Sequence, residues 1–76
     1  VRAPNLGTFY RRPKPDSDPY VEVGDEVTKS TEVCLIEVMK LFTPVKAESS
    51  GEIIAILVSD GEMVEFNQPL VLIKPS

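Results

Sequence analysis

Apolar residues along this chain gather in short runs that are separated by polar residues, Gly and Pro. Three of the runs are rich in Val and Ile and cover residues 33–38, 51–58 and 69–74. Short apolar runs bounded by turn residues are typical of buried β-strands. No stretch sustains the 3.6-residue apolar period of an amphipathic helix over three turns. The pattern predicts an all-β fold of about eight short strands, arranged as a flattened barrel or sandwich.

The two halves of the chain repeat each other. When Val21 is laid over Val58, a shift of 37 residues, four further positions are identical: Gly24/Gly61, Val27/Val64, Leu35/Leu72 and Ile36/Ile73. A solenoid needs at least about three repeats. We therefore expect two halves that close one core with approximate twofold symmetry.

The first half contains an insertion. If Gly7 corresponds to Gly51, 16 residues separate Gly7 from Gly24, whereas nine separate Gly51 from Gly61. The extra residues fall within 11–19, where three prolines remove backbone donors and fix φ. This segment is predicted to project as a stiff loop. On composition alone, a tolerated surface insertion is the alternative.

Length and composition exclude several classes of function. A chain of 76 residues makes one domain, 1–76, with a small core. It has no His, and its one cysteine, Cys34, lies in an apolar run, so we expect neither a disulfide nor a Cys/His zinc site. The net charge of −4 argues against binding nucleic acid. No apolar run approaches the roughly 20 residues of a membrane span.

Lys40 lies almost at the midpoint, where the two halves join. Strands 33–38 and 41–46 would form a hairpin whose turn is Met39-Lys40, at the end of the sandwich opposite both termini. Tight hairpins favour Asn-Gly, Asp-Gly or Gly-X, because φ must be positive there. A broken local rule is typical of a functional site. Met39 is the candidate for recognition by a partner, whereas Leu41 and Phe42 are expected to fold back into the core.

The sequence resembles the biotinyl domain of the biotin carboxyl carrier proteins of acetyl-CoA carboxylase, within the family of biotin and lipoyl attachment domains. Residues 37–41, Glu-Val-Met-Lys-Leu, are similar to that family's Glu-Ala-Met-Lys-Met/Leu motif. Residues 7–10, 20–25 and 51–53 also match, and the Pro-rich insertion 11–19 corresponds to the family's thumb. The resemblance implies a sandwich of two four-stranded antiparallel sheets.

The resemblance also implies a chemical role. Lys40 would carry biotin as an amide, attached by a biotin protein ligase that reads Val38, Met39 and Leu41. A biotin carboxylase and a carboxyltransferase would then use the tethered biotin to move a carboxyl group to acetyl-CoA, in fatty acid biosynthesis. The domain would supply no catalytic residue of its own. Its compartment would be a bacterial cytoplasm or a plastid stroma.

Two residues depart from the family pattern. Val38 stands where most members have Ala, and Arg12 stands in the thumb where many have Thr or Ser. A guanidinium at Arg12 has donors for the ureido oxygen of biotin, so a thumb contact with biotin is a hypothesis.

Three alternatives are left open. They are a lipoyl carrier of an oxo-acid dehydrogenase or glycine-cleavage system, a biotinyl domain of another acyl-CoA or pyruvate carboxylase, and an unmodified interaction module. Met39 and the insertion favour biotin over lipoate.

Overall fold

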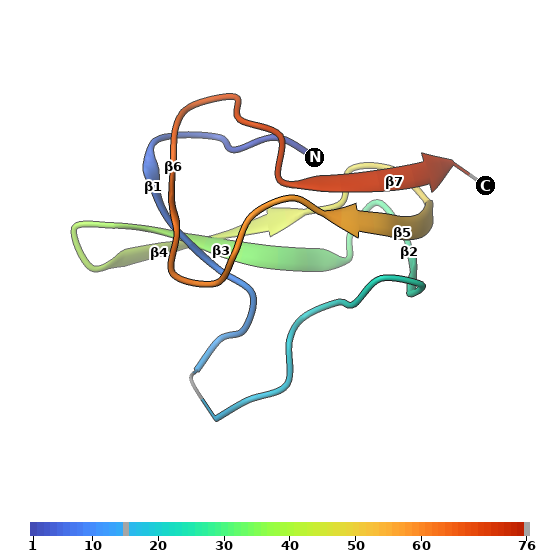
Figure 1. Ribbon diagram of the computed structural model, residues 1–76, viewed down its shortest axis with the longest axis horizontal. Coiled ribbons are helices and arrows are strands. Elements are labelled where there is room, and N and C mark those ends of the chain that lie inside the picture. Colours follow the sequence, from blue (N-terminus) through green and yellow to red (C-terminus); the bar gives the residue numbers. More distant parts are fainter. Residues whose placement is uncertain (15, 76) are drawn as a thin grey trace.

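The computed structural model describes residues 1–14 and 16–75, and none of these residues is helical. Two antiparallel sheets make up the fold, a four-stranded one in the order β4-β3-β1-β6 and a three-stranded one in the order β2-β5-β7 (Figure 1). The all-β prediction is confirmed. The strands are β1 (Gly7–Tyr10), β2 (Glu26–Val27), β3 (Glu32–Val38), β4 (Leu41–Lys46), β5 (Gly51–Ile56), β6 (Met63–Val64) and β7 (Val71–Pro75).

The core lies between the inner faces of the two sheets. Phe9 and Ile36 enter it from the four-stranded sheet, and Ile53 and Val71 enter it from the three-stranded sheet. All four are almost fully buried. Each such side chain contributes roughly 1.5–3 kcal/mol through removal of apolar surface from water. Residues that alternate with them along β1 and β5 point outward, as the period of a half-buried strand requires.

Cys34 belongs to this core, as its apolar neighbours predict. Its side chain is fully buried and makes no disulfide. Burial raises the pKa of the Cys34 thiol to about 12, because the low-dielectric interior disfavours the thiolate. The residue is therefore a neutral packing group at physiological pH.

The internal repeat is visible in the strand pairing. β1 of the first half pairs with β6 of the second, and Gly7 faces Val64. β5 of the second half pairs with β2 of the first, and Gly51 faces Val27. These two ladders correspond residue for residue under the repeat. Each half therefore donates one strand to a partner strand of the other half.

The loops obey the same symmetry down to single hydrogen bonds. The N–H of Gly24 donates to the carbonyl oxygen of Ile53, and the N–H of Gly61 donates to that of Phe9, each at 2.7 Å. Both glycines have positive φ, 100° and 85°, so both turns use the backbone region that favours glycine. The repeat seen in the sequence is thus a repeat of backbone geometry.

The second sheet has three strands among the described residues, where four were expected. The N-terminal segment approaches the place of the fourth strand through one bridge, between Arg2 and Pro69, and a hydrogen bond from the N–H of Ala3 to the carbonyl of Gln68 at 2.9 Å. Under the repeat this bridge corresponds to the Glu32/Lys46 pair of β3 and β4. The N–H of Leu70 also donates to the carbonyl of Val1 at 2.8 Å, so Arg2 and Pro69 form a non-hydrogen-bonded pair that needs no N–H from Pro69.

The insertion 11–19 contains no strand in its described residues, and Pro15 lies outside them. In Figure 1 it descends from the end of β1 and returns below the sheets. Its base is closed by two hydrogen bonds. The N–H of Tyr20 donates to the carbonyl of Arg11 at 2.8 Å, and the N–H of Arg11 donates to the Asp60 carboxylate at 2.7 Å.

The insertion covers a surface that its counterpart in the second half leaves open. Leu35 and Leu72 are the same residue type at equivalent positions, yet Leu35 is 9% exposed and Leu72 is 45% exposed. Leu35 shares a cavity lining with Pro13 and Lys14 of the insertion. Tyr10, which pairs with Leu35, and Phe42 line the same cavity, whereas Leu72 pairs with Ala55, so the insertion and the aromatic neighbours in the sheet both cover Leu35.

We predict unequal costs for the matched substitutions Leu35→Ala and Leu72→Ala. Leu35→Ala should lower the free energy of unfolding by about 2–3 kcal/mol, because it removes buried apolar contacts. Leu72→Ala should cost about 1 kcal/mol or less, because its side chain is already half in water. Urea unfolding of both variants measures the difference. Equal costs would show that the insertion adds no burial.

Candidate functional site

The β3-β4 hairpin ends in a two-residue loop. Val38 pairs with Leu41 across the hairpin, which leaves Met39 and Lys40 as its tip. Both have positive φ, 50° and 68°. That is the requirement of the tight primed turns, which Asn and Gly meet most readily. For a Met or Lys this backbone conformation costs roughly 1–2 kcal/mol per residue. The expected poor turn chemistry is therefore present as backbone strain.

Glu37 holds this strained turn. Its carboxylate oxygen Oε2 accepts the backbone N–H of Lys40 at 2.8 Å. Hydrogen bonds to a charged acceptor are stronger than those between neutral groups. Glu37 belongs to the 37–41 motif, but the sequence pattern alone assigns it no role. A carboxylate three residues before a strained residue is the signal that points to it, because acidic side chains often accept local backbone N–H groups.

The side chains at the tip are in solvent. Met39 is 88% exposed, Lys40 is exposed as well, and Val38 packs partly against the core. The expectation that Leu41 and Phe42 fold back into the core is wrong, since both are exposed. Leu41 lies at the strand end beside the turn. Phe42 faces outward and contacts the Tyr10 ring at 6.4 Å between centroids.

The hairpin forms one end of the molecule. Figure 1 shows the loop between β3 and β4 at the left end of the long axis and the end of β7 at the right. The C-terminal strand therefore ends at the far side from Lys40, as expected. Val1 lies nearer the middle of the long axis (Figure 1), where its N-terminal amine donates to the carbonyl of Val71 at 3.0 Å. The expectation that the N-terminus lies at the end opposite Lys40 is thus wrong.

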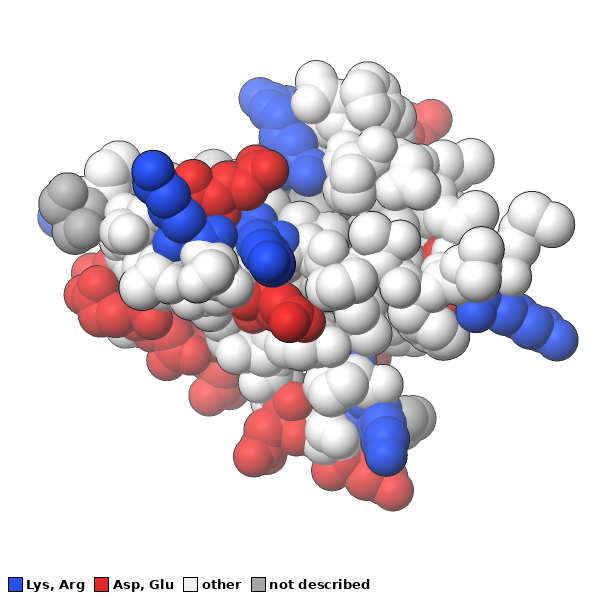
Figure 2. Space-filling model, turned by 180° about the vertical axis from the view of Figure 1, so that it is seen from behind, with Lys and Arg blue, Asp and Glu red and all other residues white. Residues whose placement is uncertain are grey.

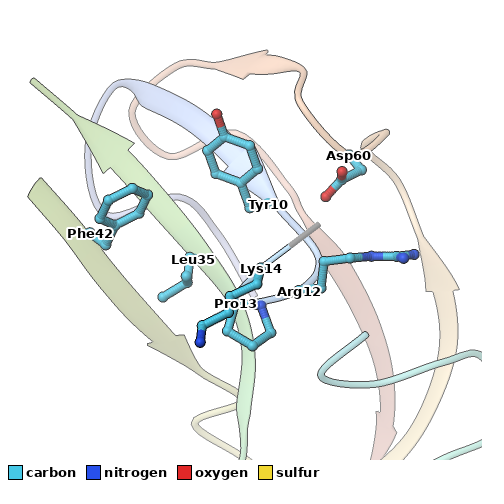
Figure 3. A pocket seen from close by; sticks show the side chains of 7 residues that line it. All are labelled: Tyr10, Arg12, Pro13, Lys14, Leu35, Phe42 and Asp60. Carbon is cyan, nitrogen blue, oxygen red and sulfur yellow. The ribbon is translucent and has the colours of Figure 1, made fainter. Parts of the chain in front are cut away.

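A cavity of about 270 Å³ lies between the insertion and the outer face of the four-stranded sheet. Its lining is Tyr10, Arg12, Pro13, Lys14, Leu35, Phe42 and Asp60 (Figure 3). Phe42 connects this cavity to the Lys40 hairpin, because it lies on β4 two residues after Lys40. The cavity therefore lies on a face that adjoins the candidate site.

Arg12 occupies the Asp60 side of this cavity. In Figure 3 its side chain extends away from Phe42 and Leu35. Its Nε is buried and has no hydrogen-bond partner. A buried donor without a partner is uncommon in folded proteins, and it leaves Arg12 with capacity to bind a further acceptor.

Other kinds of site find little support in the described parts of the chain. Within 1–14 and 16–75 no three His, Cys, Asp or Glu residues lie close enough to hold a metal ion. A search of the same residues finds no helix long and apolar enough to cross a membrane. On the face in Figure 2, Lys and Arg are dispersed among Asp and Glu and do not form one basic surface.

Comparison with known proteins decides the family. The family described as biotin-requiring enzymes matches residues 1–73. The chain belongs to this family.

Several curated relatives of this chain carry the same name, biotin carboxyl carrier protein of acetyl-CoA carboxylase. The protein of that name from Nostoc sp. (strain PCC 7120) is 52% identical over 75 residues, which is 99% of this chain and 41% of the relative. Those from Pseudomonas aeruginosa and Haemophilus influenzae are 49% and 43% identical, and the chain covers 47% and 48% of them. The chain thus spans less than half the length of these relatives.

We predict that replacing Met39 and Lys40 can make the hairpin tip more stable. The double variant Met39→Asn, Lys40→Gly should raise the free energy of unfolding by about 1–2 kcal/mol, because both residues adopt positive φ at little cost. For a domain of this size each kcal/mol raises Tm by roughly 4–8 °C.

Glu48→Asn is the matched control, since Glu48 also has positive φ, 68°, and lies outside the hairpin tip. Thermal unfolding should show a gain in the free energy of unfolding for both variants. No gain in the double variant would mean that the turn is unstrained.

Proposed function

We propose that this chain is a biotin carrier unit of an acetyl-CoA carboxylase and that Lys40 is its attachment residue. One observation carries the proposal: a lysine occupies a strained, exposed two-residue turn where Gly would be favoured. Strain of this kind at a functional position is retained when the residue is needed there. Family membership and the names of the relatives agree with biotin as the group attached.

The surroundings of Lys40 fit a covalent biotin. Its side chain is exposed, and its backbone N–H is satisfied by Glu37, so the ε-amino group can be acylated without disturbing the fold. Attachment would form an amide between Nζ and the biotin carboxyl group and break its bond to AMP in the activated adenylate. The chain would pass from a net charge of −4 to −5, because the lysine charge is lost. Biotin so attached supplies a ureido nitrogen that accepts and releases a carboxyl group.

The residues beside Lys40 are the proposed contacts of a biotin protein ligase. Met39 and Leu41 flank the lysine and are both exposed, so an enzyme that reaches Nζ meets them first. Val38 is only partly exposed because it packs against the core. We expect Val38 to act through the shape of the turn more than through direct contact.

The position of the hairpin supports delivery between two active sites. A lysine at one end of the long axis is unobstructed by the rest of the chain (Figure 1). A tethered group is presented to a biotin carboxylase and a carboxyltransferase at high effective concentration and does not diffuse away between them. In this account the chain displays biotin and delivers its carboxyl group, and the carboxylation and transfer reactions take place on its partners.

The relatives favour acetyl-CoA carboxylase over the lipoyl, pyruvate carboxylase and interaction-module alternatives. Each of the three relatives described above bears that name. A further relative, 47% identical over 75 residues, is a chloroplastic protein of Arabidopsis thaliana. We accordingly propose a bacterial cytoplasm or a plastid stroma as the compartment.

Arg12 is the proposed thumb contact with biotin. Its unpartnered Nε and its place in the cavity beside Phe42 support this role. Because its side chain extends away from Phe42 and Leu35 (Figure 3), contact with biotin on Lys40 would require a change of rotamer.

We predict one biotin per chain, at Lys40. After reaction with a biotin protein ligase, ATP and biotin, intact mass should show a single adduct, and Lys40→Arg should abolish it. Lys46→Arg is the matched control because Lys46 is an exposed lysine at the far end of β4, the strand that follows the hairpin tip. That variant should be modified as fully as the unaltered chain. A lipoyl adduct, or none, would overturn the proposal.

Arg12→Ala should shift the NMR resonances of the biotin ureido group in the biotinylated chain, because it removes the proposed donor. Lys14→Ala, in the same cavity lining, serves as the comparison. Unchanged biotin resonances in Arg12→Ala would rule out the thumb contact.

A further inference from the structure

A second hollow adjoins the Lys40 hairpin on the same outer face of the four-stranded sheet as the insertion's cavity, since Glu37 of this hollow pairs with Phe42 of that cavity. It measures about 260 Å³, and its lining is Leu6, Gly7, Thr8, Glu37, Val38, Met39 and Met63. Thr8 faces Glu37 on one side and Met63 on the other, so the floor crosses three neighbouring strands. Met39 of the hairpin tip forms part of the lining. We call this hollow the tip groove.

The tip groove is apolar and open. Met63 is 62% exposed, and Leu6 and Met39 are exposed too. A single exposed apolar residue is ordinary on a protein surface. Three that share one hollow are typical of an interaction site. The volume lies below the roughly 300–1,000 Å³ of small-molecule sites. It suits one or two inserted side chains.

The internal repeat supplies a control for this apolar character. A hollow of about 170 Å³ in the second half is lined by Glu26, Glu52, Lys74 and Pro75. Under the repeat these four correspond in turn to Met63, Thr8, Glu37 and Val38 of the tip groove.

The two hollows have the same strand pairing and opposite chemistry. Glu26 faces Glu52 in the second half, whereas Met63 faces Thr8 in the first. Leu6 likewise corresponds to Ser50, the residue before the equivalent glycine. The fold therefore accepts charged and polar residues at these positions. Apolar side chains beside Lys40 are not needed to form the sheet.

We propose that the tip groove is a docking surface for biotin protein ligase, which inserts an apolar side chain between Leu6 and Met63. The inference rests on the proposed function, since the ligase must reach Lys40. Glu37 links the two features, because it lines the groove and also holds the Lys40 backbone. Met63, with its flexible thioether, adapts to the inserted group.

The test measures ligation kinetics of the chain at saturating biotin and ATP. Met63→Gln and Leu6→Gln should each raise the KM for the protein substrate about tenfold, as loss of an interface anchor does, with kcat nearly unchanged. Met63→Leu should restore a low KM because it restores an apolar contact. Ile54→Gln is the matched control, since Ile54 is a 48% exposed strand residue on the three-stranded sheet.

The outcomes separate this inference from the proposed function. If the unaltered chain accepts no biotin, the proposed function fails. If it is biotinylated while Met63→Gln and Leu6→Gln keep the unaltered KM, or change kcat alone, the docking surface is overturned. An equal rise in KM for Ile54→Gln would overturn it as well. Two groove variants are used so that, if one of them fails to fold, the KM of the other still tests the docking surface.

Discussion

The exchange of strands between the two halves is the constraint on which the rest of this structure depends. β1 pairs with β6 and β5 pairs with β2, so neither half can complete its sheet alone. On their other sides, β1 and β5 lie close to β3 and β7, and two glycines permit this close approach. A Cβ on Gly7 would lie 2.6 Å from Cγ2 of Ile36, and one on Gly51 would overlap the carbonyl of Lys74. The shared core follows from this interlocking, and it places the chain midpoint at one end of the molecule.

On this common frame the two halves differ at several places that bear on the proposed function. The first half carries an insertion over Leu35, whereas Leu72 is left open to water. The groove beside Lys40 is apolar, whereas its counterpart is charged. The midpoint turn retains Met and Lys at positive φ. The first two differences are measured against equivalent positions in the same chain, so the common fold does not require them.

Much of this architecture could be predicted from the sequence, for physical reasons. Apolar runs in the sequence predict buried strands such as β3 and β5. Gly24 and Gly61 occupy equivalent positions of the repeat, which predicts two equivalent turns. The position of Lys40 in a tight turn follows from the two strands around it.

Other features depend on three-dimensional detail that a linear pattern does not encode. Phe42 was expected in the core, but strand register places it on the outer face against Tyr10. The hydrogen bond from Lys40 to Glu37 depends on a side-chain rotamer. The tip groove requires Leu6 and Met63 to meet across two strands that lie far apart in sequence. The single bridge between Arg2 and Pro69, in place of a full strand, is likewise a detail of the folded backbone.

The central claim is that geometry selects one lysine among the five of this chain. Peptide mapping of the enzymatically biotinylated chain, with occupancy quantified at every lysine, tests that claim most directly. The account predicts that all enzymatic biotin lies on Lys40 and that the other four lysines remain unmodified. Biotin distributed over several exposed lysines, or located on a lysine outside the hairpin tip, would contradict it.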